Sequence, residues 1–256
     1  MGKSQPSQAG FTLIEIAIVL LVVTILLGYT VAMFSVQQEL KQYRSAESEM
    51  DSVIKHLIAF AQVNGRLPCP DTSAGAGTID GLEDILLPSD CEAFFGFLPA
   101  RTLGINGKYN SVGTLVDPWG SGYGYAVSEF DAGGDGIIEL VSANGVRNAG
   151  IAAVVPDLFI CDDSNVLGNN LDCTSVSGNE VIGTNGAVAA VVISLGKDSA
   201  IPATSNIQAE NLDNFNDGTL DKVYIFSPRR DDYDDIVKWL PTNQLFSKMI
   251  EAGQLP

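Results

Sequence analysis

A single carboxylate, Glu15, stands near the start of the longest apolar stretch in this 256-residue chain. Residues 11–34 contain no other charged side chain. As a helix they would span roughly 36 Å, which is enough to cross the hydrocarbon core of a bilayer. An acid near the middle of such a span costs about 2.5–3.5 kcal/mol, so its presence indicates a function. We therefore expect residues 11–34 to form a helix that lies in a membrane or in another apolar environment.

The peptide bond between Gly10 and Phe11 lies where the polar N-terminal segment meets this apolar stretch. Cleavage there would leave a new amine on Phe11, one helical turn from Glu15. In a stack of parallel helices, an axial shift would let Glu15 of one subunit approach the Phe11 amine of its neighbour. Because the attraction is stronger in a low dielectric than in water, the pair would set the register between subunits. The alternative is an acid that reaches back to the headgroups at the membrane edge.

The segment Gly10-Phe11-Thr12-Leu13-Ile14-Glu15 resembles the cleavage site of type IV prepilins and type II secretion pseudopilins. The resemblance implies that a prepilin peptidase removes residues 1–10 as a leader, that the new N-terminal Phe11 is N-methylated, and that Glu15 is the family's glutamate. The implied partners are the peptidase, the inner membrane and other pilin or pseudopilin subunits. The implied location is a single-pass inner-membrane protein with a periplasmic domain, which later joins a periplasmic or extracellular filament.

An ordinary secretory signal peptide is the competing interpretation of the N-terminus. Lys3 supplies a weak positive charge, and residues 30–32 (Thr-Val-Ala) resemble a small-residue cleavage site. The apolar run is longer than the usual length of about 7–15 residues, and it contains Glu15. Both features favour the pilin-like interpretation.

The helical pattern continues beyond residue 34. Apolar residues recur there at steps of three and four, with one gap, which is the period of an amphipathic helix. They are Val36, Leu40, Tyr43, Met50, Val53, Leu57 and Phe60. No proline interrupts residues 7–67, and Asn64-Gly65 supplies a stop signal. We predict one helix over residues 12–63, whose second half, residues 35–63, presents an apolar stripe to a globular domain.

Residues 64–256 carry most of the negative charge. They contain 10 basic and 26 acidic residues and so a net charge of −16, out of −17 for the whole chain. Such a surface repels nucleic acid and anionic lipid headgroups, and nucleic acid is therefore not an expected partner. The segment is long enough for one hydrophobic core. We expect it to form a globular periplasmic or extracellular domain.

All four cysteines lie in this domain: Cys69, Cys91, Cys161 and Cys173. An even number suits an oxidising compartment such as the periplasm. Among the three ways of pairing them we favour Cys69–Cys91 and Cys161–Cys173, because each bond closes a short, polar, loop-like segment. A zinc site is the alternative, but the spacing contains no Cys-x-x-Cys and no histidine lies nearby.

The domain alternates short strand patterns with glycine-rich turns. We predict strands at residues 123–128, 136–141, 151–155, 188–194 and 222–227, and a final helix over residues 243–252 with Thr242 as its cap. We expect residues 162–183 to form a long polar insertion that Cys161 and Cys173 hold in place. The predicted fold class is α+β: a long N-terminal helix packed on an antiparallel sheet, with long loops held by disulfides.

Two further segments resemble the major pseudopilins. Residues 117–125 have their Asp-x-Trp-Gly-x-x-Tyr-x-Tyr pattern, and residues 194–198 have their Ser-x-Gly-x-Asp pattern. From the residues alone, Trp119 is a core anchor and the alternating tyrosines form a half-buried strand.

The same resemblance implies calcium, because major pseudopilins bind it in a C-terminal loop. Calcium takes about six to eight oxygen ligands, and carboxylates crowd this part of the sequence. The candidate ligands are Asp198, Glu210, Asp213, Asp217 and Asp221. Neither this region nor residues 131–136 completes an EF-hand pattern. A solvated acidic loop is the alternative.

Enzymatic chemistry has little support in the sequence. His56 is the only histidine and falls on the predicted helix. No Gly-x-Ser-x-Gly, P-loop or dinucleotide fingerprint is present, so we expect no enzyme.

The sequence therefore predicts a pilin-like structural subunit of a type IV pilus or a type II secretion pseudopilus. Removal of the 10-residue leader from 256 residues leaves 246, which is long for an abundant subunit and favours a minor or specialised role. Two alternatives remain: a membrane-anchored periplasmic binding domain that does not polymerise, and a tip subunit that binds a secreted substrate or adheres to a surface.

Overall fold

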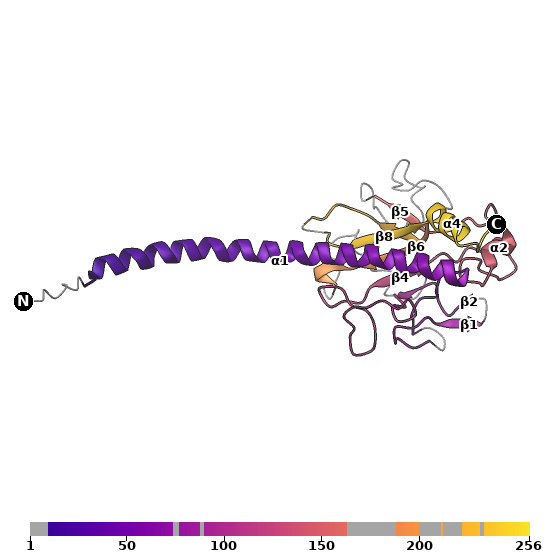
Figure 1. The fold of residues 1–256 in the computed structure, drawn as a ribbon, viewed down its shortest axis with the longest axis horizontal. Helices are drawn as coiled ribbons and strands as arrows, with labels where there is room; N and C mark the ends of the chain where they lie inside the picture. The colour runs from indigo at the N-terminus through magenta and orange to yellow at the C-terminus, as the bar shows by residue number, and fades with distance from the viewer. Residues whose placement is uncertain are drawn as a thin grey trace, which may run out of the picture. The chain divides into compact units, whose positions relative to one another are not determined.

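The structure is a computed structural model that describes residues 10–73, 77–87, 90–162, 188–199, 211, 222–230 and 233–256, with residues 28–36 described by their backbone alone. The chain divides into two compact units, Met1–Arg44 and Ser45–Pro256. Helix α1 (Leu13–Asn64) contributes to both and is 52 residues long (Figure 1). The helix predicted over residues 12–63 is therefore confirmed. Among the described residues, no helix combines the length and the hydropathy of a membrane span.

In the second unit, α1 buries one face. That face comprises Ala46, Met50, Val53, Leu57 and Ala61, each at most 1 % exposed. The predicted stripe is confirmed at Met50, Val53 and Leu57. It is wrong at Leu40, which is exposed, and at Phe60, which is only half-buried because Ala61 takes the inward position of that turn. Small side chains on the buried face allow the helix to pack closely on the domain.

Four strands form the main antiparallel sheet. Their order is β3 (Phe95–Phe97), β4 (Gly124–Val127), β6 (Val188–Ser194) and β8 (Ile236–Pro241). Strand β6 is central and buried along its whole length, as its continuous run of apolar residues predicts. The register pairs Ala126 with Val191 and Val191 with Trp239, so these three residues share one face of the sheet.

The C-terminal half of α1 crosses one face of this sheet (Figure 1). The Tyr123 hydroxyl donates a 2.8 Å hydrogen bond to Glu49 Oε2 on α1. Lys238 Nζ of β8 lies 3.1 Å from Asp51 Oδ1, two residues further along the helix from Glu49. These contacts fix the helix on the sheet within the second unit.

The other face of the sheet is covered by a parallel pair, β5 (Phe159–Cys161) and β7 (Val223–Ile225). The core between these layers consists of Ala126, Leu158, Ile160, Val188, Val191, Ile193, Leu195, Tyr224 and Val237. A small hairpin, β1 (Ile85–Leu87) with β2 (Asp90–Cys91), lies apart from the main sheet. Helices α2 (Gly145–Ala149) and α4 (Thr242–Glu251) and the short helix η2 (Gly196–Asp198) complete the described elements.

The predicted α+β class is confirmed as a mixture of helix and antiparallel sheet. Strands predicted at 123–128, 188–194 and 222–227 appear as β4, β6 and β7, and the final helix appears as α4. The strands predicted at 136–141 and 151–155 are wrong, because both segments consist of turns and irregular backbone. Gly136 begins the first segment with a φ of +82°, which an extended strand does not contain, and Gly150, with a φ of +88°, turns the chain just before the second.

The cap predicted for α4 is also wrong. Pro241 occupies the N-cap position and no side chain caps the helix. The Thr242 hydroxyl is buried and has no hydrogen-bond partner. Because Thr242 lies one residue inside the helix, its side chain faces the protein instead of the helix end.

The disulfide predicted between Cys69 and Cys91 is confirmed, with a Cα–Cα distance of 5.4 Å. It joins β2 to the segment that follows α1. Cys161 is also disulfide-bonded. Its predicted partner, Cys173, lies outside the described residues.

Candidate functional site

The start of α1 leaves the predicted cleavage site outside the helix. Gly10, Phe11 and Thr12 precede Leu13, the first helical residue. The backbone N–H groups of Glu15 and Ile16 donate to the Thr12 carbonyl at 3.1 and 3.3 Å. Gly10 has no atom within 4 Å of the position a Cβ would take, and Phe11 is 78 % exposed. No described residue therefore covers the Gly10–Phe11 bond.

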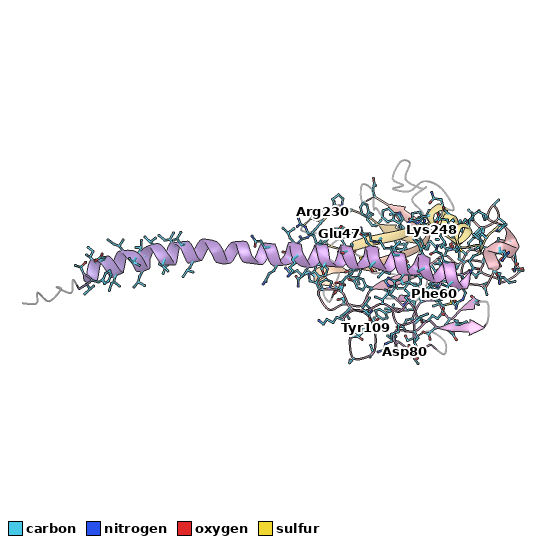
Figure 2. All side chains as sticks on the ribbon, in the orientation of Figure 1. Glu47, Phe60, Asp80, Tyr109, Arg230 and Lys248 are labelled. Atoms are coloured by element: carbon cyan, nitrogen blue, oxygen red, sulfur yellow. A yellow bond between two sulfur atoms is a disulfide. The ribbon has the colours of Figure 1, made fainter. Side chains whose placement is uncertain are left out.

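The first part of α1 is apolar around its whole circumference. Between Leu13 and Leu27 the large side chains are 41–89 % exposed, and Figure 2 shows side chains projecting from both edges of this part of the helix. They are Leu13, Ile14, Ile16, Ile18, Val19, Leu20, Leu21, Val22, Val23, Ile25, Leu26 and Leu27. Helices of this kind are stable only where other apolar groups surround them.

Two polar side chains interrupt this surface, Glu15 and Thr24. The Thr24 hydroxyl donates a 2.9 Å hydrogen bond to the Leu21 carbonyl, so its polarity is satisfied inside the helix. The Glu15 carboxylate, in contrast, makes no hydrogen bond or ion pair within the described part of the chain. It lies in the first turn, where the helix dipole favours a negative charge. Its oxygens are therefore available to a group outside the helix.

Asp117 begins the first of the two segments that resemble the major pseudopilins, and its carboxylate holds a turn together. Its Oδ1 accepts hydrogen bonds of 2.8–3.0 Å from the backbone N–H groups of Trp119, Gly120 and Ser121. The carboxylate is 1 % exposed and holds the turn that leads into β4. Trp119, predicted as a core anchor, is only half-buried. The strand predicted as half-buried is instead buried on both faces, because α1 and β5–β7 cover the sheet from opposite sides.

The acidic residues after β6 are partly described. Asp198 is hydrogen-bonded to Asp234, and burial together with this bond raises the pKa of Asp234 above its usual value. Asp235 is 3 % exposed, and burial raises its pKa to about 7. Asn211 Nδ2 donates to Asp235 Oδ2 at 2.9 Å. Asp234 and Asp235 belong to the same acidic region but are not among the five candidate ligands named from the sequence.

The remaining candidate calcium ligands, Glu210, Asp213, Asp217 and Asp221, lie outside the described residues. In the described ranges, no group of three histidine, cysteine or acidic side chains is placed to hold a metal ion. The partial EF-hand pattern at residues 131–136 has a local explanation. The Asp131 carboxylate accepts backbone N–H groups from Gly133, Gly134, Asp135 and Gly136, which folds the loop on itself.

His56 lies on α1, where Nδ1 is 2.8 Å from the Ser52 carbonyl. This contact is one turn back along the same helix. It positions the ring on the helix surface, and within the described ranges no carboxylate or hydroxyl is hydrogen-bonded to the ring.

Residues 5–31 match the family described as the prokaryotic N-terminal methylation motif. Comparison with curated proteins and with solved structures gave no match. The matched segment contains Gly10, Phe11 and Glu15 and extends beyond the described apolar side chains of α1. Proteins with this motif are in general processed by a prepilin peptidase and assemble with other pilin subunits. The chain thus carries, at its N-terminus, the signature of type IV pilins and pseudopilins.

Proposed function

We propose that this chain is a structural subunit of a type IV pilus or of a type II secretion pseudopilus, in a minor or specialised position. A prepilin peptidase cleaves between Gly10 and Phe11, and the new Phe11 amine is methylated. The observation that carries the proposal is the Glu15 carboxylate, which has no partner among the described residues although it lies on a helix that is otherwise apolar.

A neighbouring subunit can supply the missing partner. When α1 helices pack in parallel, the Phe11 amine of one copy can reach Glu15 of the next. At 4 Å such a pair is worth about 1 kcal/mol in water and about 4 kcal/mol at an effective dielectric constant of 20. Because an unpaired charge in the same place is penalised, the pair selects one axial register.

Before assembly, we place residues 11–34 in the inner membrane and residues 64–256 in the periplasm. The exposed apolar surface over residues 13–27 supports this placement, since it requires apolar surroundings. The buried Cys69–Cys91 disulfide suits an oxidising compartment. After extraction from the membrane, the same apolar surface would pack against other helices in the filament core.

The length of the domain supports a minor or specialised position over that of the abundant subunit. Two alternatives make different predictions. A membrane-anchored binding domain would be processed but absent from filaments. A tip subunit that binds a secreted substrate or a surface would be present in few copies at one end.

Calcium belongs to this proposal as a ligand of the loops around Asp198. Asp198 and Asp234 lie within hydrogen-bond distance of each other, and burial and this contact raise the pKa of Asp234. A cation between the two carboxyl groups would relieve their repulsion. Asp213, Asp217, Asp221 and Glu210 would supply further oxygens.

The test is to follow Glu15→Gln in cells that make the filament. The variant removes the charge and keeps the shape, so it should insert in the membrane at least as well as wild type. We expect it to be depleted from sheared filaments, measured by immunoblot against the membrane pool. Thr24→Ala is the matched control, because its hydroxyl is already satisfied by Leu21 and it should assemble normally. Assembly of Glu15→Gln at wild-type level would refute the register role.

A further inference from the structure

The chain contains four Asn-Gly pairs, at residues 64–65, 106–107, 144–145 and 185–186, and the structure describes the first three. In such a pair the backbone nitrogen of glycine can attack Cγ of the asparagine side chain. The bond from Cγ to the side-chain nitrogen breaks, the backbone proton leaves with it as ammonia, and a five-membered succinimide forms. Water then opens the ring to aspartate or isoaspartate. Glycine permits the reaction because it has no Cβ to block the approach.

In two of the pairs the attacking nitrogen is already occupied. The Gly65 N–H donates a 2.9 Å hydrogen bond to the Ala61 carbonyl, and the Asn64 side chain is bonded to a carbonyl one turn back. The Gly145 N–H donates to the Ser142 carbonyl, also at 2.9 Å. Each of these bonds must open before the ring can close.

The third pair differs. Asn106 and Gly107 are both exposed, and within the described part of the chain neither the Gly107 N–H nor the Asn106 side chain has a hydrogen-bond partner. Their neighbours are fixed: the Ile105 N–H donates to the Ala100 carbonyl, and the Lys108 carbonyl accepts from Val116, both at 2.9 Å. Among the described residues, Asn106 and Gly107 thus lie without hydrogen bonds between Ile105 and Lys108, whose backbones are hydrogen-bonded.

From this contrast we infer that Asn106 is a site of spontaneous deamidation in the folded protein. Water is the only co-reactant, and no enzyme or cofactor is needed. The product adds a carboxylate beside Lys108, and isoaspartate lengthens the backbone by one carbon. That change falls at the base of the loop closed by the bridge between Tyr109 and Leu115. The inference does not depend on the filament role.

The experiment incubates the full-length protein, in detergent micelles, in water labelled with heavy oxygen at mildly alkaline pH. The label enters when the succinimide opens, so peptide mass spectrometry assigns it to a residue. A hydrogen bond contributes about 1 kcal/mol, so a glycine N–H that must first break one is free about fivefold less of the time. We therefore expect peptides with residues 106–107 to gain label at least about fivefold faster than those with 64–65 or 144–145.

Two controls make the result decisive. In the urea-unfolded chain the three described Asn-Gly pairs lose their folded environment, so their rates of labelling should become similar. Asn106→Gln should remove the label at this position and leave the other pairs unchanged, because a six-membered ring closes far more slowly. Gly107→Ala is unsuitable, since its Cβ would collide with the Leu115 side chain. Equal rates at the three pairs in the folded protein, or faster labelling at 64–65 or 144–145, would overturn the inference.

Discussion

The Ser194 hydroxyl donates a 2.6 Å hydrogen bond to Oδ2 of Asp117, 77 residues earlier in the chain. Both residues are buried, and Oδ1 of the same carboxylate holds the turn before β4. Strand β6 ends at Ser194 and pairs with β4, so this one carboxylate ties a turn to the neighbouring strand. The two segments that separately resemble the major pseudopilins thus form one structural unit.

Ser194→Ala should destabilise the domain by about 1.5–3 kcal/mol, the usual contribution of a hydrogen bond to a charged group. The buried Asp117 carboxylate would keep its backbone donors but lose its side-chain donor. Urea unfolding of a fragment of residues 45–256 would measure the change. Ser111→Ala, at an exposed loop position, is the control and should stay within about 0.5 kcal/mol of wild type. Equal stability of the two variants would contradict this role of Ser194.

The mature N-terminus should be N-methylated Phe11. Intact-mass and N-terminal analysis of the membrane form in its native host would identify it. The exposed Gly10–Phe11 bond outside the helix is the physical reason, since a peptidase needs an accessible, unfolded bond. A mature chain that begins at Met33 would instead support cleavage after residues 30–32 by a signal peptidase.

Asp71 should make stability depend on pH. It is fully buried, and burial raises its pKa from 3.8 to about 6, although the N–H groups of Asp80 and Gly81 donate to it. Between these two pKa values the folded state binds more protons than the unfolded state. Stability should therefore fall as pH rises from about 4 to about 6, by on the order of 2–3 kcal/mol from this group.

Asp71→Asn isolates this contribution, because Asp235 and Asp234 also have raised pKa values in the same range. The substitution removes the titrating group and keeps the size of the side chain. The difference in unfolding free energy between wild type and variant, measured in chelator at several pH values, should shift in favour of the variant as pH rises through about 6. A difference that is constant from pH 4 to pH 7 would mean that Asp71 has an ordinary pKa.

Calcium should raise the melting temperature of the domain, if the loops around Asp198 bind it. A ligand at a hundredfold excess over its Kd stabilises the folded state by about 2.7 kcal/mol. Magnesium should substitute poorly, because it requires tight octahedral geometry. Asp213→Ala combined with Asp217→Ala, or Asp198→Ala alone, should remove the shift. Equal melting temperatures in calcium and in chelator, at matched ionic strength, would leave these acids as a solvated surface.

Sequence reasoning was most successful where the signal is contiguous. The N-terminal methylation motif and the helix that follows it are encoded by neighbouring residues, so a local pattern identifies them. The confirmed Cys69–Cys91 bond also closes a short segment. The same holds for β6, whose short apolar run rich in β-branched residues is typical of a buried strand.

Long-range pairing accounts for most of the misses. Strand β8 was not predicted, because its six residues include Lys238 and follow an acidic run, and only the register with β6 makes them a strand. Asp235 is buried through Asn211, a contact across 24 residues. The false strand at 136–141 had the right composition, but the loop folded on Asp131 sets its backbone. For β8 and Asp235 the deciding contact lies outside any local window, whereas the Asp131 loop is local and its glycines were not recognised as a turn.

The last prediction concerns the end of α1, which is capped by the chain's own C-terminus. The Gln254 side-chain amide donates to the Gln62 and Val63 carbonyls at 2.9 and 3.2 Å. Gln62 Nε2 in turn donates to the Lys248 carbonyl at 3.1 Å. Carbonyls in the last turn of a helix have no partner within the helix, so the Gln254 amide satisfies two of them.

Gln254→Ala should cost about 1 kcal/mol through loss of this cap. Gln254→Glu should cost more, because it removes the donor and also places a negative charge at the negative end of the helix dipole, an effect of about 0.3–1 kcal/mol. Unfolding of the 45–256 fragment would rank the variants, and amide exchange at residues 64–67 would locate the change at the helix end. The penalty for glutamate should shrink at low pH, where the new carboxylate is neutral. If the Gln254→Glu variant were as stable as the wild type at neutral pH, the Gln254 amide would not cap α1. The C-terminal segment would then be held by the burial of Leu255 alone.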